Sequence, residues 1–490
     1  MSVFKVPEID ISRFPLPVRA FIGGEFVDST GDEKHTLMSS VNDVVLTKEL
    51  QWSNSHDVDL AVDSSQQGLA LWQAMSNEKR RDALIAYGNL IRENREQLHW
   101  LEAVLVGKDA AFCNFEIDVA ADLFIYYGNM IDKFPSEVVA ADQDTLRYTL
   151  RQPWGICAGI CPFNGVIITL AMKAAPALAC GNSIIIKTCE VNPFSTLFMA
   201  SLATQAGIPP GALNCLVGGA EAGNALASHM GIRKISFTGS IAVGKLIQIA
   251  AAKSNLKSVT LELGGKSPLI IFPDANLEKA LPAATLFLLM NGQGCALPTR
   301  LYVHESIAED FMAKLKTAVE AHGKRLGGDP TAASTRSSPL YHHRQKEVVL
   351  SYLESGKAEA TLLTGGGVIG DKGCYVEPTI FVDPQPNARV LKEEIFGPVL
   401  VVVKFSTDEE VLELANDTEF GLAASIWTGD ISRALRFSQR LQAGSISVNG
   451  AGGIHPSIPV GGWKQSGQGL ENGREAMLDW TQSKSVALRG

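Results

Sequence analysis

The feature that most constrains the fold is an alternation of short apolar runs with helix-like segments, which begins near residue 150. The run NSIIIKT (182–188) is rich in β-branched residues and is followed by a helix-like segment from about Pro193 to Ala206. The pattern continues through the runs LNCLVGG, KISFTGS and SVTLELGG. Strands this short and this apolar are typical of a sheet that is buried on both faces. The alternation therefore predicts an α/β fold with a doubly wound parallel sheet.

A second α/β domain is expected after Gly265, where the alternation resumes. It runs through SPLIIF, the helix-like ANLEKALPAATLFLLM (275–290), the strand RLYVHES and the helix AEDFMAKLKTAVEAH. The joint between the two domains falls near residues 262–268. We expect the first domain to comprise 1–134 and 153–262, and the second to comprise 263–475. Ligand clefts are common at such a boundary.

Two strand-like pieces belong to neither domain. The stretches DTLRYTLRQ (144–152) and TQSKSVALR (481–489) alternate apolar and polar residues, as a strand with one solvated face does. They could pair with each other or with another subunit. We therefore expect residues 135–152 and 476–490 to form a small β extension used in oligomerisation.

Charge and hydropathy narrow the class of partner. The formal net charge is −9, and lysine and arginine are scattered rather than clustered, which argues against nucleic acid and favours a small molecule. The N-terminal stretch has acidic residues and prolines where an export signal needs an apolar run. The most apolar segments, 156–186 and 281–290, are interrupted or shorter than the ~20 residues that a membrane span needs. No membrane partner is expected.

The cysteines and histidines argue against disulfides and metals. Eight cysteines in 490 residues are too sparse for a disulfide scaffold, and they lack the paired CxxC spacing of a zinc site. They suit a reducing cytoplasm. His342 and His343 are adjacent, so on a regular element their side chains diverge. No metal site is expected.

Cys295 is the first candidate for chemistry. It stands behind Asn-Gly-Gln-Gly, where two glycines leave the backbone open to close approach. A thiol in such a turn can act as a nucleophile when it is deprotonated. The alternative is the common one, that a free cysteine is a small buried hydrophobic residue.

Two further candidates are Glu262 and Asn164. A carboxylate inside the apolar run TLELGG is costly to bury unless it is paired or used, and a raised pKa would suit a general base. A solvent-facing glutamate at a strand end is the alternative. Asn164, in CPFNG, could present its amide to an oxygen that acquires negative charge, or it could simply cap a helix.

A nucleotide-binding pattern accompanies these residues. Lys187 and Glu190 stand at the carboxyl end of a strand, where open α/β sheets bind ligands and where a carboxylate can accept ribose hydroxyls. Gly239 and Gly244 lie at a strand-to-helix turn, which allows a pyrophosphate to meet a helix N-terminus. The spacing differs from GxGxxG.

Together these fragments resemble the NAD(P)-dependent aldehyde dehydrogenases. The resemblance runs from FIGGEFVDS (21–29) to the C-terminus. Its landmarks, in the family's order, are CPFN, Lys187 with Glu190, FTGSIAVG, LELGGKSP, NGQGCALPTR, EEIFGPV and PVGGWKQSG.

The resemblance implies a role for each matching residue. Cys295 would be the nucleophile, Asn164 would hold the oxyanion, Glu262 would activate water and Lys173 would assist proton relay, unless Lys173 is a solvated helix residue. The cofactor would be NAD, with NADP possible but weaker. The implied cofactor-binding residues are Ile160, Phe163, Lys187, Glu190, Thr238, Gly239, Ser240, Gly244, Leu263, Gln345, Glu394 and Phe396. A homodimer or homotetramer is also implied.

Departures from the family's pattern concern the substrate and one contact. Gly165 stands where many members carry a large aromatic side chain, and Met172, Ile454 and Val460 occupy other positions that line the substrate tunnel. Their apolar character favours a hydrophobic or aromatic aldehyde. Leu470 replaces a usual arginine, which puts a subunit or interdomain contact in doubt.

Two alternatives stay open. A CoA-acylating relative is one, although that branch typically lacks the glutamate that Glu262 matches. A noncatalytic protein that kept the fold is the other, since fold does not guarantee function.

Overall fold

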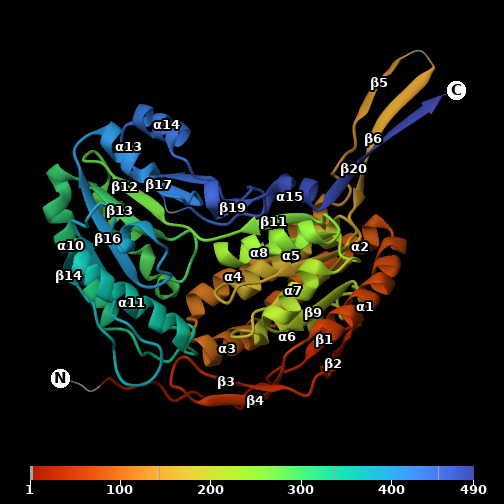
Figure 1. Ribbon diagram of the computed structural model, residues 1–490, viewed down its shortest axis with the longest axis horizontal. Coiled ribbons are helices and arrows are strands. Elements are labelled where there is room, and N and C mark those ends of the chain that lie inside the picture. The colour runs from red at the N-terminus through yellow and green to blue at the C-terminus, as the bar shows by residue number, and fades with distance from the viewer. Residues whose placement is uncertain (1–3, 143, 337, 451, 490) are drawn as a thin grey trace.

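The computed structural model describes residues 4–142, 144–336, 338–450 and 452–489. Residues 1–3, 143, 337, 451 and 490, which fall within the predicted domains and the predicted β extension, lie outside the described residues. Figure 1 shows two α/β bodies side by side and a narrow β extension that projects from one of them.

The first body is built on an eight-stranded sheet. Its strand order is β19 (Gly467–Gln468), β11 (Ser258–Glu262), β10 (Lys234–Thr238), β7 (Ile156–Ile160), β8 (Ser183–Thr188), β9 (Leu213–Val217), β1 (Ala20–Ile22) and β2 (Glu25–Val27). The five strands from β11 to β9 are parallel, and the flanking strands are antiparallel. The expected doubly wound parallel sheet is confirmed.

Helices cover both faces of this sheet. One face carries α2 (Asn77–Glu93), α3 (Arg95–Val106), α4 (Ala110–Met130), α5 (Val166–Ala179) and α6 (Phe194–Leu202), and the other carries α1 (Ser55–Ala74), α7 (Ala220–Ser228) and α8 (Ile241–Lys253). In β8, Ile184 and Ile186 pack in the first core and Ile185 packs in the second. Burial on both faces explains why the strand is a continuous apolar run.

The second body is built on a seven-stranded sheet. Its order is β14 (Thr361–Thr364), β15 (Thr379–Val382), β16 (Val399–Phe405), β13 (Pro298–His304), β12 (Ser267–Ile271), β17 (Ala423–Trp427) and β18 (Ser445–Val448), with only β14 antiparallel. Its helices are α9 (Leu277–Ala284), α10 (Glu305–Gly323), α11 (His343–Glu359), α12 (Arg389–Lys392), α13 (Asp408–Asn416) and α14 (Ile431–Arg440). The chain passes from the first sheet to the second between β11 and β12.

The helix expected over 275–290 is wrong in its second half. After α9 the chain forms a 3-10 segment, η1 (Leu286–Gly292), that contains non-helical residues. Leu289 is extended, and Met290 and Asn291 have φ of 50° and 52°. Left-handed residues cannot continue a right-handed helix. The kink turns the chain just before Cys295.

The β extension joins the two strand-like pieces found in the sequence. β6 (Thr145–Pro153) lies between β5 (Val138–Asp142) and β20 (Thr481–Arg489), and nine residues of β6 pair in antiparallel register with β20. The two pieces therefore pair with each other. Val138 and Leu488 are exposed on this sheet.

The remaining elements are short. β3 (Lys34–Met38) and β4 (Val45–Gln51) form a two-stranded sheet, and η2 (Lys464–Ser466) and α15 (Gly473–Asp479) lead to β20. No helix in the described part of the chain is long and apolar enough to cross a membrane.

Candidate active site

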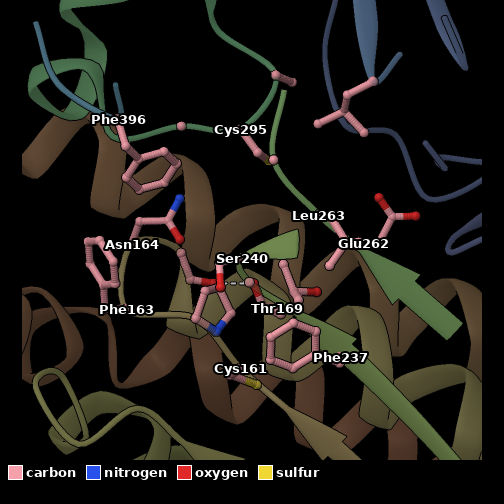
Figure 2. A pocket seen from close by; sticks show the side chains of 18 of the residues that line it. Cys161, Phe163, Asn164, Thr169, Phe237, Ser240, Glu262, Leu263, Cys295 and Phe396 are labelled. Carbon is pink, nitrogen blue, oxygen red and sulfur yellow. Dashed lines mark hydrogen bonds between the residues drawn. The ribbon is translucent and has the colours of Figure 1, made fainter. Parts of the chain in front are cut away.

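A cavity of about 1540 Å³ lies between the two bodies and is lined by residues from both. Its walls come from the carboxyl ends of β7, β8, β10 and β11, from α4, α5, α7 and α8, and from the segment around Cys295. All the sequence-predicted site residues except Lys173 and Gly244 line it. Figure 2 shows Cys295, Asn164 and Glu262 around the same cavity.

Cys295 is partly buried in a turn that packs tightly against neighbouring backbone. A Cβ on Gly265 would lie 2.2 Å from the Cys295 carbonyl oxygen, and one on Gly292 would lie 2.0 Å from the Gly397 carbonyl oxygen. Both glycines are therefore required by close approach of two backbones. Burial raises the pKa of the Cys295 thiol to about 12, and the nearby Glu394 and Glu262 add to this effect. The thiol is protonated in this arrangement.

Asn164 is buried and holds the Cys295 turn. Its side-chain Nδ2 donates a hydrogen bond to the Gln293 carbonyl, 2.8 Å away. The N-cap of α5 is Gly165, which makes no side-chain hydrogen bond, so the helix-cap alternative for Asn164 is wrong. Gln293 itself is anchored because its Oε1 accepts the Tyr341 N–H and its Nε2 donates to the Met290 carbonyl.

Glu262 ends β11 with its side chain buried and its Oε1 without a hydrogen-bond partner among the described residues. Burial raises the pKa of Glu262 well above its ordinary value, Glu471 raises it further, and Lys173 lowers it. The alternative of a solvent-facing glutamate is wrong. A buried carboxyl of this kind accepts a proton readily at neutral pH.

Lys173 is fully buried, so the alternative of a solvated helix residue is wrong. Its Nζ donates to Ser236 Oγ at 2.9 Å and to Thr238 Oγ1 at 2.8 Å, and it pairs with Glu471 Oε1 at 2.7 Å. Glu471 lines the cavity and was not singled out in the sequence, although it follows Leu470 in a glycine-rich stretch. The sequence feature that could have identified Glu471 is the presence of a carboxylate between Leu470 and Gly473.

The end of the cavity beside β8 carries Lys187 and Glu190. Lys187 Nζ lies 3.8 Å from Glu190 Oε2, and 35% of the Glu190 side chain is exposed. A Cβ on Gly223 of α7 would lie 3.9 Å from Lys187 Cε. The Glu190 carboxylate is thus partly open to a ligand, whereas the Lys187 side chain is buried.

The two glycines after β10 lie close to neighbouring side chains. A Cβ on Gly239 would lie 2.5 Å from the Phe237 ring, and one on Gly244 would lie 2.8 Å from Leu263 Cδ2. Ser240 caps α8 by accepting the Val243 N–H. This keeps the first turn of α8 at the cavity wall, where helix N–H groups favour an anion.

The loop that carries Glu394 and Phe396 lies across the cavity from β7. Glu394 Oε1 accepts the Gly265 N–H at 3.0 Å, and burial raises the Glu394 pKa to about 7. The Phe396 ring stands edge-on to Phe163, with centroids 5.6 Å apart. Gln345 donates to the Ile395 and Phe396 carbonyls, so its amide orders this loop.

Part of the cavity wall is mostly apolar. It includes Gly165, Met172, Ile454 and Val460, together with Phe112, Phe115, Glu116, Ile168 and Thr169. Leu470 lies outside it, beside Gly461, whose Cβ would lie 2.6 Å from Leu470 Cδ2.

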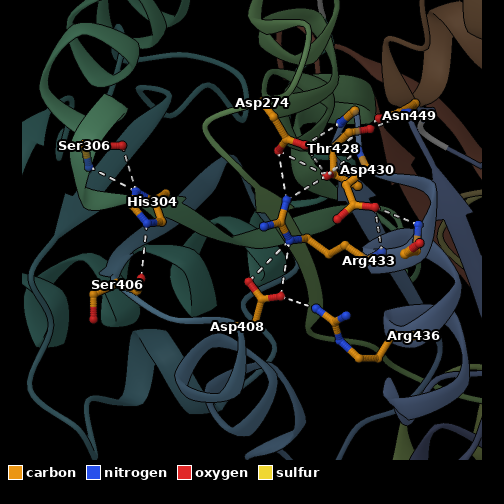
Figure 3. A network of polar contacts seen from close by, with 12 residues as sticks. Asp274, His304, Ser306, Ser406, Asp408, Thr428, Asp430, Arg433, Arg436 and Asn449 are labelled. Carbon is orange, nitrogen blue, oxygen red and sulfur yellow. Dashed lines mark hydrogen bonds and ion pairs between the residues drawn. The ribbon is translucent and has the colours of Figure 1, made fainter.

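A second polar cluster lies away from the cavity (Figure 3). Arg433 pairs with Asp274 at 3.1 Å and with Asp408 at 3.2 Å, and Thr428 donates to Asp274. Its charges compensate one another, so the cluster is structural. His342 caps α11 and His343 pairs with Asp43, and no metal-binding cluster occurs among the described residues.

Comparisons with known proteins identify the family. The aldehyde dehydrogenase family model matches residues 26–486. The chain belongs to the aldehyde dehydrogenase family. Aldehyde dehydrogenase 1 of Tanacetum cinerariifolium is 42% identical over 475 residues, which cover 96% of this chain and 94% of that one. Human retinal dehydrogenase 2 is 40% identical, with 90% and 86% covered.

Among solved aldehyde dehydrogenases, the indole-3-acetaldehyde dehydrogenase of P. syringae, a mutant in complex with NAD+ and IAA, superposes with a TM-score of 0.94. It is 36% identical, with 98% of each chain covered. The fold expected from the sequence is therefore the fold of this family.

Proposed function

We propose that this protein oxidises aldehydes to carboxylic acids with NAD+, through a thioester on Cys295 that water hydrolyses. The observation that carries the proposal is that Cys295, Asn164 and Glu262 share one cavity with the Lys187–Glu190 pair. A nucleophile and a base would then share this space with groups suited to a nucleotide, which supports the proposal.

The residues present fit a dinucleotide. Glu190 keeps an exposed carboxylate beside Lys187, which suits ribose hydroxyls, and the glycines after β10 bring the start of α8 to the cavity wall. Glu394 and Phe396 would hold the nicotinamide half. NAD+ supplies the hydride acceptor that converts the adduct on Cys295 into a thioester. The P. syringae relative, solved with NAD+, supports this cofactor.

Cys295 and Asn164 act in the first half of the reaction. The Cys295 sulfur, once its proton has left, forms a bond to the aldehyde carbon, and the carbonyl oxygen takes the electron pair. The Asn164 amide and the Cys295 N–H stabilise that oxyanion. Because burial raises the thiol pKa, a proton acceptor is needed. Glu394 and Glu262 both raise that pKa further, and Glu262, whose Oε1 has no hydrogen-bond partner among the described residues, would accept the proton.

Glu262 acts in the second half. Its carboxylate removes a proton from water as the water oxygen attacks the thioester carbon, and the C–S bond then breaks to release the acid and the Cys295 thiolate. Lys173 and Glu471 set the pKa of Glu262 from opposite directions. They would pass its proton onward.

Product analysis tests this proposal against its rivals. With an aldehyde, NAD+ and CoA present, we expect NADH and free acid in equal amounts. Acyl-CoA formed in preference to acid would favour the CoA-acylating alternative. No oxidation across a panel of aliphatic, aromatic and semialdehyde substrates would favour the noncatalytic one.

We also propose the domain roles, location and assembly expected from the sequence. Residues 1–134 and 153–262 bind the cofactor, 263–475 form the catalytic domain, and 135–152 with 476–490 serve oligomerisation. A cytoplasmic location is supported by the 38% identity to mouse aldehyde dehydrogenase, cytosolic 1. Sedimentation at micromolar concentration tests for a dimer or tetramer, and a monomer mass would contradict it.

A further inference from the structure

Among the described residues, more acidic than basic side chains line the cavity between the two bodies. The carboxyl side chains that line it are those of Glu116, Glu190, Glu262, Glu394 and Glu471. The lysine and arginine side chains that line it are those of Lys187, Lys253 and Arg344. Lys187 already lies 3.8 Å from the Glu190 carboxylate. The diphosphate of a dinucleotide adds negative charge, and charge taken out of water is costly unless a cation lies near it.

The two other cations, Lys253 and Arg344, lie at different ends of their helices. Lys253 is the last residue of α8, so it lies roughly 20 Å along the helix axis from Ser240, where helix N–H groups favour an anion. Arg344 lies in the first turn of α11, whose first N–H groups have no partner within the helix. Its side chain is exposed and makes no ion pair or hydrogen bond with another described residue.

One face of α11 lines the cavity. Arg344 and Val348 are one helical turn apart, Gln345 lies beside them, and all three residues line the cavity. The Gln345 amide donates to the backbone carbonyls of Ile395 and Phe396. The start of α11 is therefore held with Arg344 at the cavity wall.

The start of α11 lies against the loop that follows β7. Because β7 lies between β8 and β10, this loop begins between Glu190, which follows β8, and Ser240, which follows β10. Phe163 of the loop contacts His342, the N-cap of α11, with ring centroids 4.8 Å apart. Burial lowers the pKa of His342 to about 4, Glu190 opposes this effect, and Arg344 adds to it. Arg344 and Glu190 are therefore both within electrostatic reach of this imidazole.

We propose that Arg344 is a further cofactor-binding residue, whose guanidinium binds the 5′-diphosphate of the dinucleotide from the side of the second body. This rests on the proposed use of NAD+. A cofactor with its ribose at Glu190 and its diphosphate at the helix N-terminus beside Ser240 passes the start of α11. A guanidinium there donates charge-assisted hydrogen bonds to phosphate oxygens and offsets the carboxyl groups around the cavity.

Binding measured without turnover tests this contact. ADP-ribose contains the diphosphate, adenosine lacks it, and both can be titrated by calorimetry. We expect Arg344→Gln to weaken ADP-ribose binding about tenfold and to leave adenosine binding unchanged. Lys357→Gln, the control, removes a cation from the last turn of the same helix, away from the cavity, and should bind both ligands as the parent does. Equal ADP-ribose affinities in the parent and Arg344→Gln, or an equal loss for both ligands, overturn the proposal.

NADH and NADPH show which phosphate is bound, because they share the diphosphate and differ in the 2′-phosphate. In fluorescence titrations we expect Arg344→Gln to weaken the binding of both by the same factor. Arg344→Lys keeps the charge without the planar fork and should recover part of the lost affinity. A loss confined to NADPH would assign Arg344 to the 2′-phosphate, and a lysine variant that binds no better than the glutamine variant would exclude its charge as the cause. Either result overturns the proposal.

The same titrations separate this inference from the proposed function. A parent protein that binds neither NADH nor ADP-ribose would overturn the proposed use of NAD+, and this inference with it. A parent that binds both, beside an Arg344→Gln variant of equal affinity, overturns this inference alone.

Discussion

Lys173 Nζ lies 2.7 Å from Glu471 Oε1, and both groups act on the pKa of Glu262 from opposite directions. Glu471 lies almost 300 residues further along the chain than Lys173. Its Oε1 also accepts a hydrogen bond from Ser236 Oγ of β10. The buried ion pair thus couples the C-terminal segment to the residue proposed to activate water.

Glu471→Gln should move the pH dependence of thioester hydrolysis. Because the Glu471 charge raises the pKa of Glu262 and Lys173 lowers it, removal of Glu471 should lower that pKa. The acid limb of the kcat profile should therefore move to lower pH. Glu475→Gln, on α15 nearby, serves as the control and should keep the parent profile. An acid limb that stays in place or moves upward would contradict the coupling.

Glu262→Gln should make the folded protein more stable at neutral pH. A carboxyl whose pKa is higher in the folded than in the unfolded state holds its proton more tightly when folded, so stability falls as pH rises from the unfolded value of about 4.3 toward the folded value. Glutamine does not titrate and removes this penalty. Apparent melting temperatures compared at several pH values test this. A gain that grows on acidification would have the wrong sign.

The sequence was sufficient to predict the fold and most of the residues that line the cavity, because both depend on local pattern. The run from Ile184 to Ile186 in β8 is apolar because each of its residues packs into one of the two cores that flank the sheet. Cys295 lies three residues after Gly292 and Glu262 lies three residues before Gly265, and both glycines are required by close backbone contact. Constraints of this kind can be recognised from residues that are close together in the sequence.

The missed features depend on residues that only the folded chain brings together. Nothing near Lys173 in the sequence indicates that it is buried against Glu471, and nothing near Gly165 points to Glu116 on α4. The break at Leu289 follows from the left-handed conformations of Met290 and Asn291, which periodicity does not reveal. Gln345 lines the cavity as expected, and nothing near it in the sequence indicates that its amide also holds the backbone of the Phe396 loop.

Glu190 should set the preference between cofactors. A carboxylate that accepts a hydrogen bond from the adenosine 2′-hydroxyl repels a 2′-phosphate, although Lys187, 3.8 Å away, attracts it. We expect the parent to favour NAD+ over NADP+ by at least about tenfold in kcat/KM, and Glu190→Gln to reduce that ratio. Equal values in the parent, or the same ratio in the variant, would show that another group sets the preference.

Gly265→Ala should displace the nucleophile without removing any reacting group. The new Cβ would lie 2.2 Å from the Cys295 carbonyl oxygen, a distance at which the turn must move. Since small misplacements of reacting groups cost about 100-fold, kcat/KM should fall by at least that factor. Gly323→Ala, whose Cβ would lie 3.5 Å from Pro378 in ordinary contact, is the control. Parent-like activity in Gly265→Ala would mean that the turn tolerates the shift.

The most direct measurement is the mass of the Glu262→Gln variant after it has been mixed with an aldehyde and NAD+. If Cys295 forms the thioester and Glu262 activates the water that hydrolyses it, the variant should release one NADH per active site in a rapid burst and then retain the acyl group. Intact and peptide mass spectrometry should place that added mass on Cys295, and Cys295→Ala should show neither burst nor adduct. A burst with the acyl group on another residue, or full steady-state turnover by Glu262→Gln with no retained adduct, would contradict the proposed mechanism.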